Sequence, residues 1–281
     1  MKIHNAEILG NSLNLGHLFS RSPLQNLFDP SNRRPGVSAA QYRKEFVSIF
    51  KHLAPHHHRF DVFRDFVHAA AIAIQNAFLK SDELEQEYFV IERRLGKENM
   101  SQLSQLLGCV IGALDAEPSD FLGSLYMELE LSASSLGQLF TPYSLSEMMA
   151  ALTMSDAVQN LNKHPFITYN EPACGAGGMA IAAAMYMREN GYNPQEQIFM
   201  VCTDIDGMVA DMCYIQLSLL CIPAQVITGN TLTLTLTLTL TLTVNRTFHT
   251  PFWYLGGWEE KLKHAEAVER MMTIFSRLQA A

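Results

Sequence analysis

The sequence predicts an α/β fold in which a doubly wound parallel sheet follows an all-helical N-terminal domain. The first observation is that apolar residues recur at helical spacing, at i, i+3 and i+4, between residues 38 and 131. The second is a change after Thr141-Pro142, where short apolar runs alternate with helical stretches. The third is a glycine-rich turn at residues 174–178, between the first apolar run and the following helix. This order of strand, glycine turn, helix and strand is typical of nucleotide-type α/β domains.

Length and composition limit the class of protein. A chain of 281 residues with 48% hydrophobic and 17% charged residues is long enough for one large domain or two modest ones, and it is neither disordered nor fibrous. No run approaches the roughly 20 consecutive apolar residues that a membrane-spanning helix needs. The five cysteines are an odd number without paired spacing, and Met1–Glu7 lacks a signal pattern. We therefore expect a cytoplasmic protein with reduced core thiols and no membrane contact.

Changes in composition and in the spacing of apolar residues divide the chain into four regions. Prolines and polar residues without a sustained period indicate an N-terminal arm, and apolar residues from Trp258 to Phe275 indicate an amphipathic last helix. The predicted regions are an arm at 1–36, a helical domain at 37–135, a core at 136–256 and a C-terminal helix at 257–281. Within the core, residues 231–242 are six Thr-Leu pairs, a low-complexity tract that we expect to be part strand and part loop.

The predicted core contains three strands with helices between them. The strands are expected at 166–169, 198–203 and 224–228, and the helices at 179–189 and 209–220. A helix before the first strand carries the apolar stripe Leu145, Met148, Met149 and Leu152. Methionine fills irregular gaps well, so we expect Met148, Met149, Met271 and Met272 to lie in the core.

The net charge of −8 hides an uneven distribution of charge. Between Arg21 and Arg64 there are eight lysines and arginines against three acids. Such a basic region is a candidate nucleic-acid contact, with the test residues Arg33, Arg34, Arg43 and Lys44. The alternative is a solvated surface. We predict no metal site, because three adjacent histidines at 56–58 cannot all face one ion from a regular element.

The glycine turn is the main functional clue. Gly175, Gly177 and Gly178 would let the backbone approach a ligand closely at the start of a helix. Asp204 follows the second predicted strand about thirty residues later, where a carboxylate can accept hydrogen bonds from a ribose. The ligand of such a site is a dinucleotide or S-adenosylmethionine. Alternatively, the glycines only permit tight packing.

Several segments resemble one family when they are read in order. They are Asp120–Glu128, Gly137–Pro142, Asn170–Gly178, Asp204–Asp206 and Thr228–Leu232. Together they resemble the N6-adenine DNA methyltransferases, and especially the modification subunit of type I restriction systems. The segments extend over roughly residues 120–232, about 40% of the chain, so their combination is far more specific than a lone glycine loop.

The resemblance implies a truncated Rossmann-like core of a methyltransferase that depends on S-adenosylmethionine. Glu171 and the turn at 174–178 would cradle the methionine end of the cofactor, and Asp204 would accept hydrogen bonds from the ribose. Asn230 stands where the family usually has Asp, and its amide oxygen can still accept a hydrogen bond from the adenine amino group. The implied cofactor residues are Phe140, Thr141, Pro142, Glu171, Pro172, Cys174, Gly175, Gly177, Gly178, Asp204, Asp206 and Asn230.

The catalytic motif of the family departs from its usual form. The N6-adenine methyltransferases carry Asn/Asp/Ser-Pro-Pro-aromatic after the fourth strand, where it holds the amino group of a flipped adenine. No such tetrapeptide occurs, and the Thr-Leu tract stands in its place. The candidates are Thr250, Pro251, Phe252 and Trp253, which retain one proline and the terminal aromatic residue. The alternative is a loop with buried aromatic side chains.

The resemblance implies adenine-specific DNA methylation of the restriction–modification type. Its expected partners are DNA and a specificity or restriction subunit, or a second copy of the chain. A different class of function is a catalytically inactive module that binds S-adenosylmethionine or DNA and regulates or counters restriction. The absent tetrapeptide and the acidic net charge favour this second class. A methyltransferase that acts on RNA or protein is the third interpretation.

Overall fold

The computed structural model describes residues 36–129, 131, 140–231 and 244–279. Almost all of the predicted arm and of the Thr-Leu tract lies outside these residues, as do Arg33 and Arg34. Helices before the sheet are α4 (Ala39–His52), α5 (Arg59–Asn76), α6 (Asp82–Leu95), α7 (Lys97–Ala116), α8 (Phe121–Glu128), α9 (Tyr143–Ala157) and the 3₁₀ helix η2 (Val158–Asn162). The following elements are β1 (Ile167–Glu171), α10 (Gly178–Glu189), α11 (Pro194–Gln197), β2 (Ile198–Asp204), α12 (Gly207–Leu219), β3 (Ala224–Gly229), β4 (Val244–His249), α14 (Pro251–Leu255) and α15 (Trp258–Gln279).

Local signals set the ends of the N-terminal helices. Helix α4 begins with a capping box, in which Ser38 Oγ accepts from the Gln41 N–H and Gln41 Oε1 accepts from the Ser38 N–H at 2.7 Å. Helix α6 begins after Ser81, whose side chain caps Leu84, and ends at Gly96, where φ is +84°. The apolar stripes face inward, with Phe46, Phe50, Phe63, Phe66, Val67, Ile91, Leu103, Leu107 and Val110 buried.

The sheet has four strands in the order β1-β2-β3-β4. Strands β1, β2 and β3 run parallel, with Tyr169 paired to Met200 and Cys202 paired to Val226. Strand β4 runs antiparallel to β3, which makes the sheet mixed. The α/β prediction and the helical N-terminal region are confirmed. The prediction of a parallel sheet holds only for β1, β2 and β3. The strand that follows the Thr-Leu tract, β4, pairs antiparallel with β3 at the edge of the sheet.

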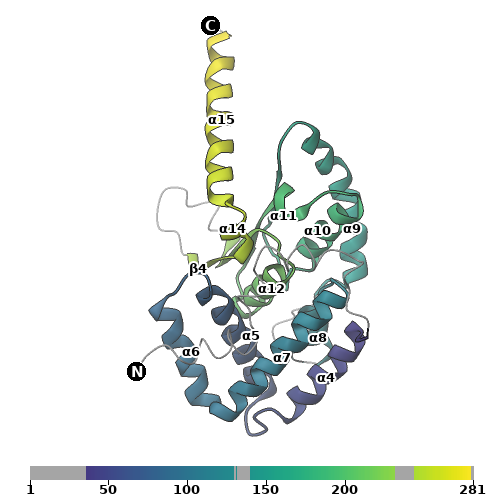
Figure 1. Ribbon diagram of the computed structural model, residues 1–281, viewed down its shortest axis with the longest axis vertical. Helices are drawn as coiled ribbons and strands as arrows, with labels where there is room; N and C mark the ends of the chain where they lie inside the picture. Colours follow the sequence, from purple (N-terminus) through teal and green to yellow (C-terminus); the bar gives the residue numbers. More distant parts are fainter. Residues whose placement is uncertain (1–35, 130, 132–139, 232–243, 280–281) are drawn as a thin grey trace.

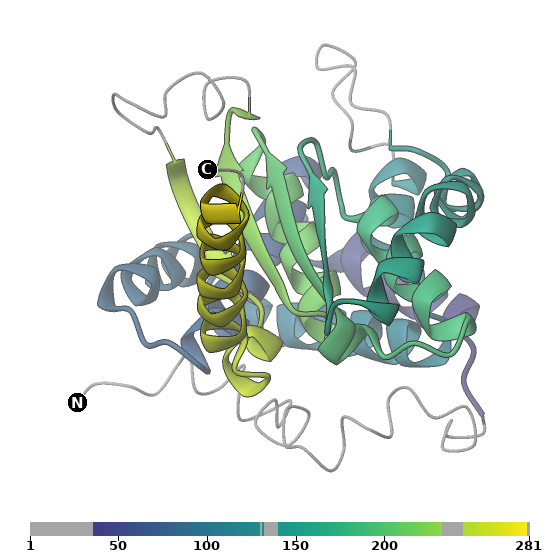
Figure 2. The same ribbon diagram turned by 90° about the horizontal axis from the view of Figure 1, so that it is seen from above.

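The helices lie on both faces of the sheet (Figure 1, Figure 2). Helices α10 and α12 cover one face, and helix α5 packs against α12. All residues of α12 from Met208 to Leu219 are buried, because the helix lies between the sheet and the N-terminal helices. On the other face, the α15 residue Trp258 stacks on Phe199 at 5.7 Å between ring centroids. One continuous hydrophobic core therefore joins the regions 37–135 and 136–256, which the sequence divides into two.

Helix α9 presents the predicted apolar stripe to solvent rather than to the core. Leu145, Met148, Met149 and Leu152 are 40%, 55%, 41% and 72% exposed. The side of α9 that is buried carries the smaller residues Ser146 and Ala150 together with Met154. The core assignment of Met148 and Met149 is therefore wrong, because close packing of α9 on α10 selects the face with small side chains.

The C-terminal helix α15 extends away from the rest of the molecule (Figure 1). Its N-terminal residue Trp258 is fully buried, whereas Met271 and Met272 are 57% and 67% exposed. The core assignment of these two methionines is also wrong, since they lie on the projecting part of the helix. Among the described residues, the hydropathy and length of every helix fall short of a membrane span.

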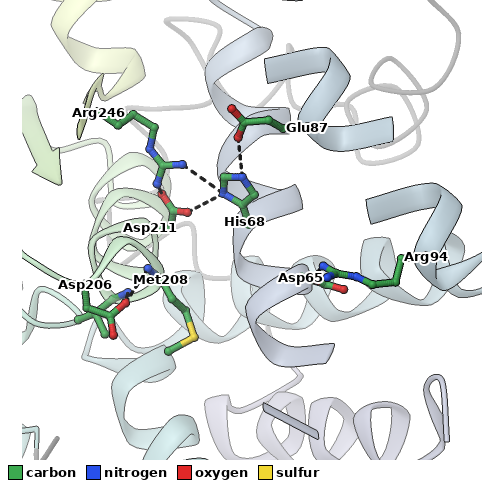
Figure 3. Close-up of polar contacts among 9 residues, drawn as sticks. Asp65, His68, Glu87, Arg94, Asp206, Met208, Asp211 and Arg246 are labelled. Carbon is green, nitrogen blue, oxygen red and sulfur yellow. Dashed lines mark hydrogen bonds and ion pairs between the residues drawn. The ribbon is translucent and has the colours of Figure 1, made fainter. Parts of the chain in front are cut away.

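A charge cluster around the buried Asp211 joins the N-terminal helices to the sheet (Figure 3). His68 on α5 contacts Asp211 on α12 through Nδ1 and Glu87 on α6 through Nε2, each at 2.8 Å. Arg246 on β4 donates a hydrogen bond to the same Asp211. Desolvation lowers the pKa of His68, but the hydrogen bond and charge of Asp211, with a contribution from Glu87, outweigh it and raise the pKa. Protonated His68 therefore stabilises this junction.

Replacement of His68 by Gln is expected to change how stability depends on pH. A raised histidine pKa stabilises the fold fully below the unfolded value, about 6.5, and this stabilisation is lost as the pH rises through the folded value. The difference in unfolding free energy between the wild type and His68→Gln should therefore be larger at pH 6 than at pH 8. Urea denaturation at both pH values measures it, with the exposed His164→Gln as control. An equal difference at both pH values would contradict the assignment.

Candidate functional site

The parallel strands end at one edge of the sheet and bring the predicted cofactor residues together there. Strand β1 ends at Glu171, β2 at Asp204 and β3 at Gly229. The Cys174 N–H donates to the Thr203 carbonyl at 2.9 Å, which ties the glycine turn to β2. Thr231 Oγ1 donates to the Pro172 carbonyl at 2.6 Å, so the end of β3 also reaches the turn. This carboxyl edge is where ligands of open α/β sheets bind.

The glycine turn has a backbone that only glycine adopts easily. Gly175 has φ +55° and Gly177 has φ +96°, and Gly177 is the residue before α10 begins. A Cβ on Gly177 would lie 3.0 Å from Cys213 Sγ, and one on Gly175 would lie 3.3 Å from the Phe140 ring. Tight packing is therefore one reason for the glycines. The same absence of side chains leaves the backbone open to a ligand at the N-terminus of α10.

Replacement of Gly177 by Ala is expected to lower the free energy of unfolding by about 2–4 kcal/mol. An L residue at positive φ costs about 1–2 kcal/mol, and contact with Cys213 adds to this cost. Gly191→Ala is the matched control, because Gly191 has φ +83° but no atom within 4 Å of an added Cβ. Urea denaturation compares the two variants. Equal losses would show that packing against α12 does not constrain the turn.

Asp204 is held by the backbone of the site. Its Oδ2 accepts from the Gly175 N–H at 2.9 Å, and its Oδ1 accepts from the Asp206 N–H at 3.0 Å. A carboxylate has about four acceptor positions, so the group can still accept from two hydroxyls. Asp206 Oδ1 accepts from the Met208 N–H at 2.9 Å and caps α12. Asp206 therefore has a structural role in addition to its predicted place in the site.

Glu171 lies at the end of β1 with a hydrogen-bonding partner on its own strand. The Tyr169 hydroxyl donates to Glu171 Oε2 at 3.0 Å. Desolvation raises the pKa of Glu171, against the opposing effects of this hydrogen bond and of one from the Ala173 backbone. A cationic group that reached this carboxylate would favour its ionised form and be bound by it. This chemistry suits the ammonium group of a bound methionine moiety.

Two buried hydroxyl groups in the first turns of α9 lack hydrogen-bond partners among the described residues. They are Tyr143 OH and Ser146 Oγ. Ser146 Oγ lies 3.6 Å from the position that a Cβ on Gly178 would take, so this hydroxyl is the one located beside the glycine turn. A buried hydroxyl without a partner costs about 1–3 kcal/mol. Neither residue was predicted from the sequence.

A buried hydrogen-bond network that was not predicted from the sequence holds the glycine turn against α12 and the start of α8. Gln216 Nε2 on α12 donates to Asp120 Oδ1 at 2.9 Å and to the Ala176 carbonyl at 2.8 Å. Gln216 Oε1 accepts from the Leu122 N–H at 2.9 Å. Asp120 also accepts from the Gly123 N–H, and desolvation raises its pKa. The available signal was a glutamine within a largely apolar helix, whose other polar residues include Asp211 and Ser218.

The remaining predicted cofactor residues differ in their surroundings. Thr141 and Pro142 are exposed at the start of α9, and Asn230 is half-buried beyond the end of β3. Phe140 packs edge-on against Tyr126 at 5.4 Å between centroids. Cys174 is buried, and although its hydrogen bond with Cys213 lowers its pKa, desolvation raises the pKa overall. Such a thiol is a poor nucleophile.

The basic residues predicted to contact DNA are only partly described. Arg43 donates to Glu128 at 2.9 Å and to Ser124 at 2.6 Å, and its guanidinium lies over the Phe121 ring. These contacts hold α4 against α8. Lys44 is exposed. Arg33 and Arg34 lie outside the described residues, so the proposed basic surface stays a prediction.

The structure does not bring the catalytic candidates to the glycine turn. Because β4 is antiparallel to β3, Thr250 lies beside Ala224 at the amino edge of the sheet, opposite the turn. Thr250 Oγ1 donates to the Ile222 carbonyl at 2.7 Å and accepts from the Ala224 N–H at 2.9 Å. Pro251 and Phe252 continue into α14, and Trp253 stacks on His249 at 4.4 Å. The contacts of this tetrapeptide are those of a structural turn.

Comparisons with known proteins place the chain in a family. The family model of the N-6 DNA methylases matches residues 120–269, which is more than half of the chain. No curated protein matches. A crystal structure from Listeria monocytogenes, provisionally assigned to the class I S-adenosylmethionine-dependent methyltransferases, matches with 13% identity and a TM-score of 0.38. That match covers 73% of this chain and 52% of the other, so this chain spans about half the length of the protein it matches.

Proposed function

Because this chain belongs to the N-6 DNA methylase family, we propose that it binds S-adenosylmethionine at the carboxyl edge of its sheet and acts in N6-adenine methylation of DNA. The family resemblance predicted from the sequence is confirmed. The observation that carries the proposal is the convergence of Glu171, the glycine turn and Asp204 at one edge, where the buried Ser146 hydroxyl near Gly178 has no partner among the described residues. These groups match the ammonium, carboxylate and ribose of the cofactor in chemical type.

Each residue of the site has a defined task in this proposal. Glu171 binds the ammonium group, and the hydroxyl of Ser146 near Gly178 contributes to binding of the amino-acid end of the cofactor. Asp204 accepts from the ribose hydroxyls while its own orientation is fixed by the Gly175 and Asp206 N–H groups. When bound, S-adenosylmethionine supplies an electrophilic methyl group. Glu171 and Asp204 are half-buried, and partial removal from water strengthens the interactions of their carboxylates with the cofactor.

The acceptor for the adenine amino group comes from elsewhere in this proposal. Thr250–Trp253 lies at the opposite edge of the sheet, and among the described residues no strand lies beyond β1. We propose that the acceptor is supplied by residues outside the described part or by a partner subunit. A requirement for such a subunit fits a restriction–modification system, in which the partner also selects the DNA target.

Transfer of a labelled methyl group from S-adenosylmethionine to DNA tests the activity. The chain is incubated with DNA that lacks adenine methylation, alone and with candidate partner subunits from the same host. N6-methyladenine at a defined sequence supports the proposal. Cofactor binding without transfer under all of these conditions would remove the catalytic part of it.

A second candidate function is a catalytically inactive module that binds the cofactor or DNA and regulates or counters restriction. The position of Thr250–Trp253 favours it, because the degenerate motif makes structural hydrogen bonds instead of lining the site. Methylome sequencing of a host without adenine methylases, with and without this chain, separates the two functions. New methylation at a defined sequence excludes the inactive module.

A further inference from the structure

A cavity of about 440 Å³ opens between α5, α6, α12 and the β3–β4 edge of the sheet. None of the residues assigned above to the cofactor lines it, although its wall includes Gly207 and Met208 at the start of α12. Figure 3 shows the charged side chains on its walls, with the His68–Asp211–Arg246 group on one side and Asp65 with Arg94 on the other. The volume lies in the range of small-molecule sites.

A carboxylate oxygen of Asp65 that is unpaired among the described residues is the feature of the cavity that indicates a ligand. The residue is 2% exposed, and its Oδ1 accepts a hydrogen bond from the Arg94 guanidinium. Its Oδ2 is buried and has no hydrogen-bond partner among the described residues. A buried acceptor without a donor is destabilising, and more so when it is charged. Asp65 Oδ2 therefore requires an N–H or O–H donor that this part of the chain does not supply.

The other carboxylates of the cavity already have partners. His68 and Arg246 bond Asp211, and His68 also bonds Glu87. Asp65 is thus the acceptor that remains for a ligand. Of the three carboxylates that line the cavity, Asp65 is the one with a buried oxygen that has no partner among the described residues.

The cations of the cavity suit an anionic group. Arg64 and Arg94 are 43% and 40% exposed at its rim, and Arg246 lies deeper at 22%. Each guanidinium has five N–H groups, more than its ion pair uses, and a planar fork that matches phosphate oxygens. The buried side chain of Ile91 and the largely buried side chain of Met208 add apolar surface between these polar groups.

We propose that this cavity binds a nucleotide, with its phosphate on Arg64 and Arg94, its base beside Met208 and Ile91, and a base N–H donating to Asp65 Oδ2. A nucleotide carries a hydrogen-bond donor for Asp65, a phosphate for the arginines and an apolar ring face for the small apolar part of the lining at Ile91 and Met208. A free nucleotide and a nucleotide within a DNA strand share this chemistry. The site goes beyond the proposed function, since it is separate from the glycine turn and needs no methyl transfer.

Calorimetric titration of the full chain with guanosine 5′-monophosphate tests the proposal. Guanine offers two adjacent N–H groups and lacks the adenosine of the cofactor, so binding at the glycine turn does not mimic it. Asp65→Asn and Arg64→Gln should each weaken binding at least about 10-fold, the loss expected for one charge-assisted hydrogen bond. The exposed Arg93→Gln is the matched control and should bind as the wild type does.

Further titrations locate the binding site and show whether its ligand is a free nucleotide or part of DNA. Asp204→Ala should leave guanosine 5′-monophosphate binding unchanged, whatever its effect on the cofactor. Asp65→Asn should not weaken the binding of inorganic phosphate, because phosphate does not reach Asp65. A short single-stranded oligonucleotide that binds more tightly than the mononucleotide assigns the site to DNA, and the reverse order assigns it to a free nucleotide.

Three results would overturn the proposal. They are no binding of guanosine 5′-monophosphate to the wild type, binding that Asp65→Asn and Arg64→Gln leave unchanged, and binding that is lost in Asp204→Ala. The first would mean that water satisfies Asp65. Circular dichroism of each variant verifies its fold. Arg64→Gln removes an exposed side chain, so it keeps the test valid if Asp65→Asn does not fold.

Discussion

Replacement of Asp204 by Ala is expected to weaken the binding of S-adenosylmethionine at least about 100-fold. The carboxylate would accept two ribose hydroxyls in the proposed complex, and hydrogen bonds to a charged acceptor contribute about 1.5–3 kcal/mol each. The variant also removes the acceptor of the Gly175 N–H, which orients the glycine turn. Both effects weaken binding. Calorimetric titration of the wild type and the variant measures the change.

Asp204→Asn separates the two effects. Asparagine keeps one side-chain oxygen for the backbone N–H groups but loses the charge, so an intermediate loss of about 10-fold is expected. A folded Asp204→Ala variant that binds as tightly as the wild type would show that the ribose is not held here. Failure of the wild type to bind S-adenosylmethionine would mean that the family motifs are retained for the fold and do not form a binding site.

The strands at the centre of the sheet could be predicted because their signals are local. The runs at 198–203 and 224–228 are apolar, short and bounded by polar or glycine residues, and the structure has β2 and β3 there. The glycine turn was predictable for the same reason. Two of its glycines have positive φ, which other residues rarely adopt. The backbone conformation of the turn therefore requires glycine at these positions, and the glycines are visible in the sequence.

Features that depend on distant partners could not be predicted. Helix α9 has apolar residues on more than one side, so only the packing against α10 decides that the small residues face inward. Strand β4 follows a low-complexity tract, and its pairing with β3 depends on the return path of the chain. The candidate tetrapeptide at 250–253 was assigned from its residue types alone. Its place at the amino edge follows from the antiparallel direction of β4, which no local pattern records.

Gln216 is the residue whose replacement is expected to affect stability most. Gln216→Leu keeps the volume of the side chain approximately but removes the partners of the Ala176 carbonyl and the Leu122 N–H, and one of the two donors to Asp120 Oδ1. A buried polar group that loses its partner costs about 1–3 kcal/mol. We therefore expect the free energy of unfolding to fall by about 3–5 kcal/mol, as measured by urea denaturation. Gln159→Leu, at an exposed position, is the control and should change stability by less than about 0.5 kcal/mol.

A double-mutant cycle shows whether the network acts as a unit. Asp120→Ala alone leaves Gln216 without one acceptor, and Gln216→Leu alone leaves a buried carboxyl with its pKa already raised by desolvation. If the two residues support the turn together, the double variant loses less stability than the sum of the single losses, by about 1–3 kcal/mol. Additive losses would mean that Gln216 braces the Ala176 carbonyl independently of Asp120. In either case the glycine turn depends on α12, because the same glutamine side chain holds the turn and the start of α8.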